Sequence, residues 1–270
     1  MPSPRQSYPH RKASLLLLAL AFSSASAQAV EPDPINLRFE VFGGPGLHFL
    51  TLRVRVDEAG GRYAIAVEAE TRSLADLFVD LRSRLEVRGR VSTGALWPEA
   101  MRAETRRRGV ELDTRIDSGA DGTILAEATP PPIGPVTPVT PAQMRGTVDQ
   151  LTAYLALAHT IARRSSCALA LAVFDGRRRY DLSFTDLAPE TLPDFASPTQ
   201  VCRMSRQRIA GFRVDRAGKS ATDLGKLWFA RLVPGDLAIP VRMEFDSEFG
   251  TFTADLAELR GRGVDLRFTE

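Results

Sequence analysis

The chain has 270 residues, of which 44% are hydrophobic and 25% are charged. This composition excludes a disordered chain, a coiled coil and a collagen-like repeat, and its longest apolar run is far shorter than the roughly 20 residues of a membrane-spanning helix. The 35 basic and 33 acidic side chains nearly cancel. We therefore expect neither nucleic-acid binding nor a helical membrane protein.

The first 27 residues are typical of a secretory signal peptide. A basic pair precedes an apolar stretch over residues 13–22, and residues 25–27 (Ala-Ser-Ala) supply the small side chains that signal peptidase recognises. We expect cleavage after Ala27, with cleavage after Ala29 as the second option. No cysteine follows the apolar stretch directly, so a lipid anchor is not expected.

Such a signal predicts that residues 28–270 form a single β-rich domain, exported to the periplasm of a Gram-negative bacterium. In an oxidising compartment, an even number of cysteines favours disulfides. This part of the chain holds two, Cys167 and Cys202, and we expect them to be bridged. A redox-active pair is the alternative, but the Cys-x-x-Cys spacing is missing.

Alternation of apolar and polar residues, which is typical of strands with one buried face, dominates residues 28–270. It begins at Ile35–Val41 and returns at Leu50–Val56 and Tyr63–Ala69. Further alternating segments lie at 85–91, 101–107, 110–116, 123–128, 169–173, 180–184, 201–212, 226–232, 240–245 and 251–259. About a dozen strands with short turns predict a mainly β fold, a curved antiparallel sheet or incomplete barrel with two helices packed on it.

Two segments show the three- and four-residue spacing of amphipathic helices. The first follows Ser73, and the second runs over 148–163 with Thr147 as its N-cap. Their apolar stripes include Leu74, Leu77, Phe78 and Leu81 in the first helix and Leu151 and Leu155 in the second. Residues 129–141, with six prolines, are expected to form an extended connection.

A β-hairpin is predicted at Asp175-Gly176, because this dipeptide stands between two alternating segments. The hairpin also contains one of two arginine runs, 106–108 and 177–179. Arginines of this kind are able to bind a phosphate or a lipid headgroup through paired hydrogen bonds, or they are solvated ends of strands.

The sequence predicts no catalytic residues, no metal site and no cofactor. Residues 28–270 contain two histidines, His48, expected to be exposed, and His159, expected at the edge of the core. The spacings of a nucleophile elbow, a phosphate-binding loop, a zinc protease and a calcium loop are missing. A hydrolase built on paired carboxylates is the enzymatic alternative, but no spacing singles out a pair.

Several of these segments together resemble a bacterial exported family, domain of unknown function 3108. The resemblance rests on Gly146–Asp149, Cys167, Val173–Leu182, Leu74–Leu77, Arg82–Arg84, Val201–Arg203, Ile239–Glu244 and Gly250-Thr251, with Asp175, Gly176, Arg178 and Tyr180 as the hairpin signature. It implies a long, curved antiparallel sheet, similar in outline to periplasmic lipoprotein carriers whose half-barrels hold acyl chains around inserted helices. It implies no activity.

We therefore expect a protein without enzymatic activity that binds an apolar or amphiphilic component of the cell envelope or supports envelope assembly. Its partner would be a lipid or another envelope protein. The candidate ligand-lining residues are Leu74, Leu77, Phe78, Leu151 and Leu155. The main alternative is a ligand-free module that binds an envelope protein through a strand edge. An outer-membrane barrel is disfavoured by arginine and glutamate on the outward strand faces.

Overall fold

The computed structural model describes residues 32–44, 46–71, 80–132, 134–214, 222–247 and 250–268. Its strands are β1 (Ile35–Gly43), β2 (Leu47–Ala59), β3 (Arg62–Thr71), β4 (Leu81–Ser92), β5 (Ala95–Arg107), β6 (Val110–Ser118), β7 (Ile124–Thr129), β8 (Leu169–Phe174), β9 (Arg179–Asp186), β10 (Gln200–Ala210), β11 (Thr222–Ala230), β12 (Ile239–Ser247), β13 (Gly250–Gly261) and β14 (Val264–Arg267). The helices are α2 (Pro141–Met144) and α3 (Gln150–Arg164). The predicted mainly β fold is confirmed.

All described strands belong to one antiparallel sheet, in the order β7-β6-β5-β4-β3-β2-β1-β13-β12-β11-β10-β9-β8, with β14 paired to β13. Two meanders, β1 to β7 and β8 to β13, join where β1 pairs with β13. The sheet is open because β7 and β8 form its two ends. The connection between these ends contains both described helices.

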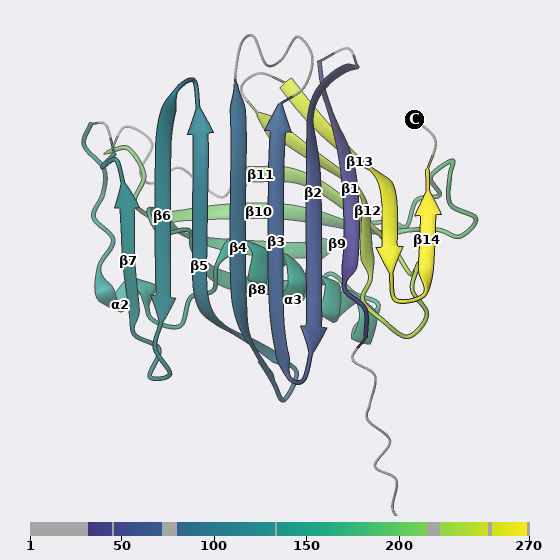
Figure 1. The fold of residues 1–270 in the computed structure, drawn as a ribbon, viewed down its shortest axis with the longest axis horizontal. Coiled ribbons are helices and arrows are strands. Elements are labelled where there is room, and N and C mark those ends of the chain that lie inside the picture. The colour runs from purple at the N-terminus through teal and green to yellow at the C-terminus, as the bar shows by residue number, and fades with distance from the viewer. Residues whose placement is uncertain are drawn as a thin grey trace, which may run out of the picture. The chain divides into compact units, whose positions relative to one another are not determined.

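The sheet curves back on itself (Figure 1). Strands β2 to β7 form the layer nearer the viewer, and β8 to β12 cross behind it. Register shifts interrupt the pairing of β1 between Arg38 and Phe39 and between Val41 and Phe42, and that of β10 between Met204 and Ser205. Such bulges bend a strand and increase its twist, which helps one sheet form two facing layers.

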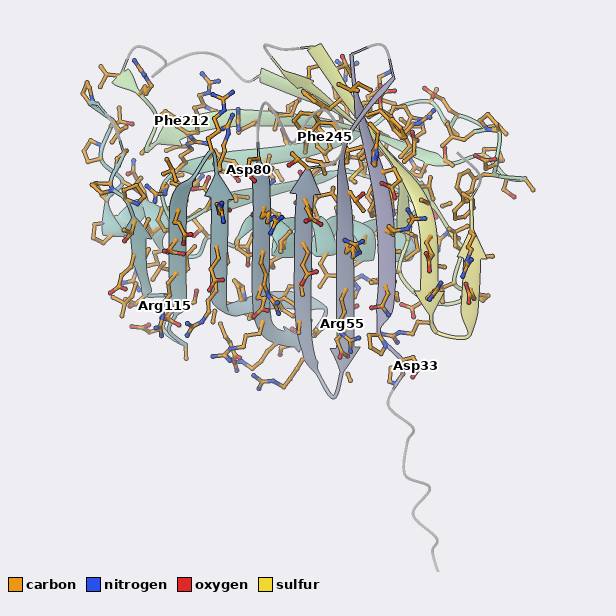
Figure 2. All side chains as sticks on the ribbon, turned by 45° about the horizontal axis from the view of Figure 1, so that its top comes forward. Asp33, Arg55, Asp80, Arg115, Phe212 and Phe245 are labelled. Carbon is orange, nitrogen blue, oxygen red and sulfur yellow. A yellow bond between two sulfur atoms is a disulfide. The ribbon has the colours of Figure 1, made fainter. Side chains whose placement is uncertain are left out.

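Alternation along the strands separates a buried inner face from a solvated outer one. In β1, Ile35, Leu37 and Phe39 are buried and point to the inner face. Charged side chains such as Arg55 of β2 and Arg115 of β6 lie on the outer face (Figure 2). Burial of the apolar inner face is the main source of folding free energy.

Helix α3 begins two residues later than predicted. Its N-cap is Asp149, whose carboxylate accepts a hydrogen bond from the backbone N–H of Thr152 at 2.9 Å. The predicted N-cap, Thr147, donates its hydroxyl to the carbonyl of Met144 at 2.7 Å. Most of the other predicted helix, after Ser73, lies outside the described residues, but Leu81, assigned to its apolar stripe, is instead the first residue of β4.

The predicted disulfide is confirmed. Cys167 and Cys202 are bonded, with their Cα atoms 5.6 Å apart and both side chains buried. The bridge links Cys167, two residues before β8, to β10, across the intervening strand β9. Asp186 at the end of β9 accepts a hydrogen bond from the N–H of Cys167 at 2.7 Å. This end of the sheet is therefore held by covalent as well as polar contacts.

The predicted Asp175-Gly176 hairpin connects β8 and β9, and its turn contacts β6 in the other half of the sheet. Asp175 Oδ1 accepts hydrogen bonds from the N–H groups of Arg177 and Arg178, at 3.0 and 2.7 Å. Gly176 has a φ of 90°, and a Cβ atom there would lie 2.2 Å from Cγ2 of Thr114 in β6. The hairpin turn therefore packs directly on the opposite half of the sheet.

We predict that Gly176→Ala lowers the free energy of unfolding by about 1–3 kcal/mol, because alanine is strained at positive φ and its methyl group would overlap Thr114. Urea unfolding measures the loss. Gly109→Ala is the matched control, since Gly109 has a φ of 73° but no atom within 4 Å of the added methyl group. Equal losses in the two variants would show that the contact with Thr114 carries no energy.

A candidate apolar binding cavity

A cavity of about 260 Å³ lies between the inner face of the sheet and helix α3. Its walls come from β1, β2 and β3 on one side and from β11, β12 and the segment before β12 on the other. The lining includes Leu37, Phe39, Val54, Ile65, Val67, Ala158, Leu227, Phe229, Met243 and Phe245, the last of which is labelled in Figure 2. The cavity therefore lies between the two layers of the sheet.

Two of the residues predicted to line a ligand site do line this cavity. Leu151 and Leu155 reach it from α3. Leu74, Leu77 and Phe78 lie outside the described residues. The strand residues of the cavity wall were not predicted as lining, although their alternating pattern places them on the buried face. Alternation predicts which face of a strand is buried, but it does not predict where the packing of side chains leaves a cavity.

The lining is polar at one end. Of the described lining residues, Gln150 and Tyr154 alone have polar side chains. The hydroxyl of Tyr180 donates to Oε1 of Gln150 at 3.4 Å, and that of Tyr154 donates to Sδ of Met204 at 3.5 Å. Burial raises the pKa of both tyrosines, so their hydroxyls stay protonated at neutral pH.

The N-terminus of α3 is fixed by a buried polar network. Asp149 accepts hydrogen bonds from the backbone N–H and from the side-chain hydroxyl of Thr152. The hydroxyl of Thr152 also contacts the hydroxyl of Tyr63 in β3 at 2.8 Å. Burial raises the pKa of Asp149, while the hydrogen bonds from Thr152 oppose this shift. The network joins the start of the cavity's helical wall to β3.

The C-terminal half of α3 is held by both layers of the sheet. His159 contacts Glu58 of β2, with 2.8 Å between Nε2 and Oε1. Arg231, which follows β11, donates to the carbonyls of Ile161 and Ala162 at 3.0 Å each. A cation at these terminal carbonyls also complements the helix dipole. Because both ends of α3 are tied to the sheet, the helix forms a fixed wall of the cavity.

The two histidines occupy structural positions. His159 is mostly buried, at the edge of the core, as expected. His48, expected to be exposed, has a side chain only 33% exposed and lies 2.8 Å from the buried carboxylate of Glu40. Glu40 also accepts a hydrogen bond from Thr51 at 2.7 Å. Over the described ranges, no cluster of histidine, cysteine, aspartate or glutamate is arranged to hold a metal ion.

The arginines of the run 177–179 have three different environments. Arg177 donates to the carbonyl of Pro130 at 2.7 Å. The guanidinium of exposed Arg178 lies 5.7 Å from the ring centre of Phe212, while Arg179 pairs with Asp181 at 2.7 Å. In the other run, Arg106 lies 3.9 Å from Asp80. Arg106 and Arg107 are neighbours in β5 and therefore face opposite sides of the sheet, whereas Arg177 and Arg178 lie in the turn before β9.

The fold and the cavity define a class of protein, an open antiparallel sheet curved around a helix with an apolar space inside. The family described as Protein of unknown function (DUF3108) matches residues 38–257, so the chain belongs to this family. Among curated proteins nothing matches. No helix in the described part of the chain is long and apolar enough to cross a membrane.

A similar solved structure is the crystal structure of a beta-barrel-like protein of domain of unknown function DUF1849 from Brucella abortus. The TM-score is 0.52 at 10% sequence identity, and the match covers 86% of this chain and 99% of that one. At this identity the likeness shows a shared fold and carries no function.

We predict that Asp149→Ala lowers the free energy of unfolding by about 1–2 kcal/mol, because the first turn of α3 loses its N-cap. Asp149→Asn keeps an acceptor and is the control. Burial raises the native pKa of Asp149, so the stability gained by its protonation is present below about pH 4 and lost as pH rises through the native pKa.

Urea unfolding across this pH range measures both effects. Relative to Asp149→Asn, the wild-type protein should lose stability as the pH rises. Parallel pH profiles for the two proteins would contradict a buried, perturbed carboxyl at this position.

Proposed function

We propose that the protein is an exported binding protein without enzymatic activity, which holds an apolar or amphiphilic component of the cell envelope between its sheet and α3. The observation that carries the proposal is the cavity of about 260 Å³, whose described lining is apolar except at Gln150 and Tyr154. Ligand pockets are typically apolar with a few placed polar groups, and start at roughly 300 Å³. A volume near this lower bound suits one small apolar group, such as an aliphatic chain or an aromatic ring system.

Export to the periplasm is proposed from the N-terminal segment and is compatible with the disulfide between Cys167 and Cys202. The outline of periplasmic lipoprotein carriers, in which a half-barrel holds acyl chains around inserted helices, agrees with a sheet curved around α3. This agreement is an analogy of fold, so it supports the proposal without identifying the ligand.

The contacts of the two histidines support the absence of enzymatic activity. His159 ties α3 to β2 through Glu58, and His48 is paired with buried Glu40. Each ring is therefore engaged in a contact that holds the fold. A histidine that acts as a general base would instead need to accept a hydrogen bond from the substrate or nucleophile group whose proton it abstracts.

A second candidate function is a ligand-free interaction module of the cell envelope. The observation that favours it is β7, an end strand of the sheet on which the side chain of Leu125 is 70% exposed. An end strand presents backbone N–H and C=O groups to which a partner strand can add. In this alternative, the cavity would be a packing defect of the core and would stay empty.

We predict that the purified protein binds the neutral apolar probe N-phenyl-1-naphthylamine with a rise in fluorescence, and that Ala158→Phe abolishes this rise. Ala158 lines the cavity, so a phenyl group there would fill it. Ala156→Phe is the matched control, because Ala156 lies on the same helix but outside the lining. A fluorescence titration compares the three proteins.

Circular dichroism should show that both variants keep the β-sheet spectrum. Equal binding by Ala158→Phe and wild type would place the probe elsewhere on the protein. Absence of binding by the wild type would remove the support for a ligand and favour the interaction module.

We further predict that the chain expressed in a Gram-negative host is recovered from the periplasm with Gln28 as its first residue, or Val30 if cleavage follows Ala29. Its intact mass under non-reducing conditions should be lower than that of the reduced chain by two hydrogen atoms, because of the disulfide. Mass spectrometry after osmotic release measures both. A full-length chain retained in the cytoplasm would contradict export.

A further inference from the structure

Three arginines surround one aromatic ring on the β9 and β10 side of the sheet. The guanidinium carbons of Arg178, Arg206 and Arg208 lie 5.7, 5.8 and 5.4 Å from the centre of the Phe212 ring. Phe212 is buried and is labelled in Figure 2. We call Arg178, Arg206, Arg208 and Phe212 the arginine cluster. Cations are attracted to an aromatic face, but three cations around one ring repel one another.

Arg206 belongs to the inner face of the sheet. It stands opposite Leu182 of β9, and Arg208 stands opposite Tyr180. Leu182 and Tyr180 are buried in the core, as is Met204 two residues before Arg206. Because side chains opposite one another in neighbouring strands share a face, Arg206 projects toward the interior of the curved sheet.

The guanidinium of Arg206 is a partly buried cation with few polar contacts. Its Nε is buried and has no hydrogen-bond partner, and no ion pair with Arg206 occurs within the described ranges. Its guanidinium lies 5.8 Å from the ring centre of Tyr180. Burial, and the charges of Arg208 and Arg178, lower the pKa of Arg206, while the charge of Asp175 opposes this shift. A partly buried cation with like-charged neighbours is stabilised by an anion placed among them.

The arginine cluster adjoins the polar end of the cavity. Tyr180, which lies under the guanidinium of Arg206, donates its hydroxyl to Gln150, and Gln150 lines the cavity. The charge of Arg206 also acts on Tyr154, the other polar lining residue. Gln150 and Tyr154 thus lie between the apolar lining and the cationic groups. This arrangement complements an amphiphile that has an apolar chain at one end and a negative group at the other.

We propose that the ligand is a single-chain amphiphile with an anionic headgroup, a carboxylate or a phosphate. This proposal rests on the function proposed above and names its ligand class. The chain occupies the cavity along α3, and the headgroup accepts hydrogen bonds from the guanidinium groups of Arg206 and Arg178. Arginine suits this role because its planar fork of N–H groups matches the oxygens of carboxylates and phosphates.

The test compares ligands that share a dodecyl-length chain and differ in headgroup. Dodecanoate, monododecyl phosphate and neutral monolauroylglycerol are titrated into the full exported chain, below their micelle concentrations, as competitors of N-phenyl-1-naphthylamine. We expect the wild type to bind at least one anionic ligand about tenfold or more tightly than the neutral one. Tighter binding of the phosphate or of the carboxylate identifies the headgroup.

Two variants test the arginines separately. Arg206→Met keeps an apolar side chain of similar length, and Arg178→Met changes an exposed residue that the core does not need. Each should lose most of the preference for the anion while binding the naphthylamine probe as wild type does. Arg203→Met is the matched control, because Arg203 is exposed on the opposite face of the same strand. It should keep the preference.

The outcomes separate this inference from the proposed function. If the wild type binds the probe but shows no preference for the anionic ligands, the headgroup site is wrong and the apolar cavity stands. The same conclusion follows if Arg203→Met loses the preference as fully as Arg206→Met does. If the wild type binds neither the probe nor any amphiphile, the proposed function fails as well.

Discussion

The structure depends on one constraint, the need to cover the apolar inner face of an open sheet. The face runs continuously from β7 through β1 and β13 to β8. No separate layer of helices covers it in the described part of the chain, so the sheet curves until its two halves face each other. Helix α3 fills much of the space between them, and the β8–β9 turn packs on β6. The hydrophobic effect drives this closure, while β7 and β8 stay at opposite ends of the strand order and are not paired with each other in the described residues.

The cavity and the polar contacts follow from the same arrangement. A helix between two curved layers cannot fit both throughout, and a small side chain such as Ala158 leaves space beside β3 and β12. The buried contacts of Asp149 and of His159 keep the helix in one position, so the space has a defined wall. The arginine cluster lies beyond the polar end of that wall. Apolar space and positive charge are therefore neighbours in the fold.

The sequence predicted what depends on local patterns. Alternation identified the buried face of β1, and Asp175-Gly176 identified the hairpin. It missed the true N-cap, since Thr147 and Asp149 are both good caps and tertiary contacts decide between them. Along β10, apolar character alone would place Ile209 inside, but Ile209 is 38% exposed and its neighbour Arg208 faces inward. Pairing with β9 sets this register, so the sequence alone does not predict the arginine cluster.

The central claim is that the apolar space between the sheet and α3 holds a single-chain amphiphile. Native mass spectrometry of the chain isolated from the cells that produce it tests this most directly. We expect a native mass above that of the denatured chain, with the excess released as a single-chain acid or phosphate, and no excess in Ala158→Phe. An unliganded native monomer of the wild type, isolated without detergent, would contradict it.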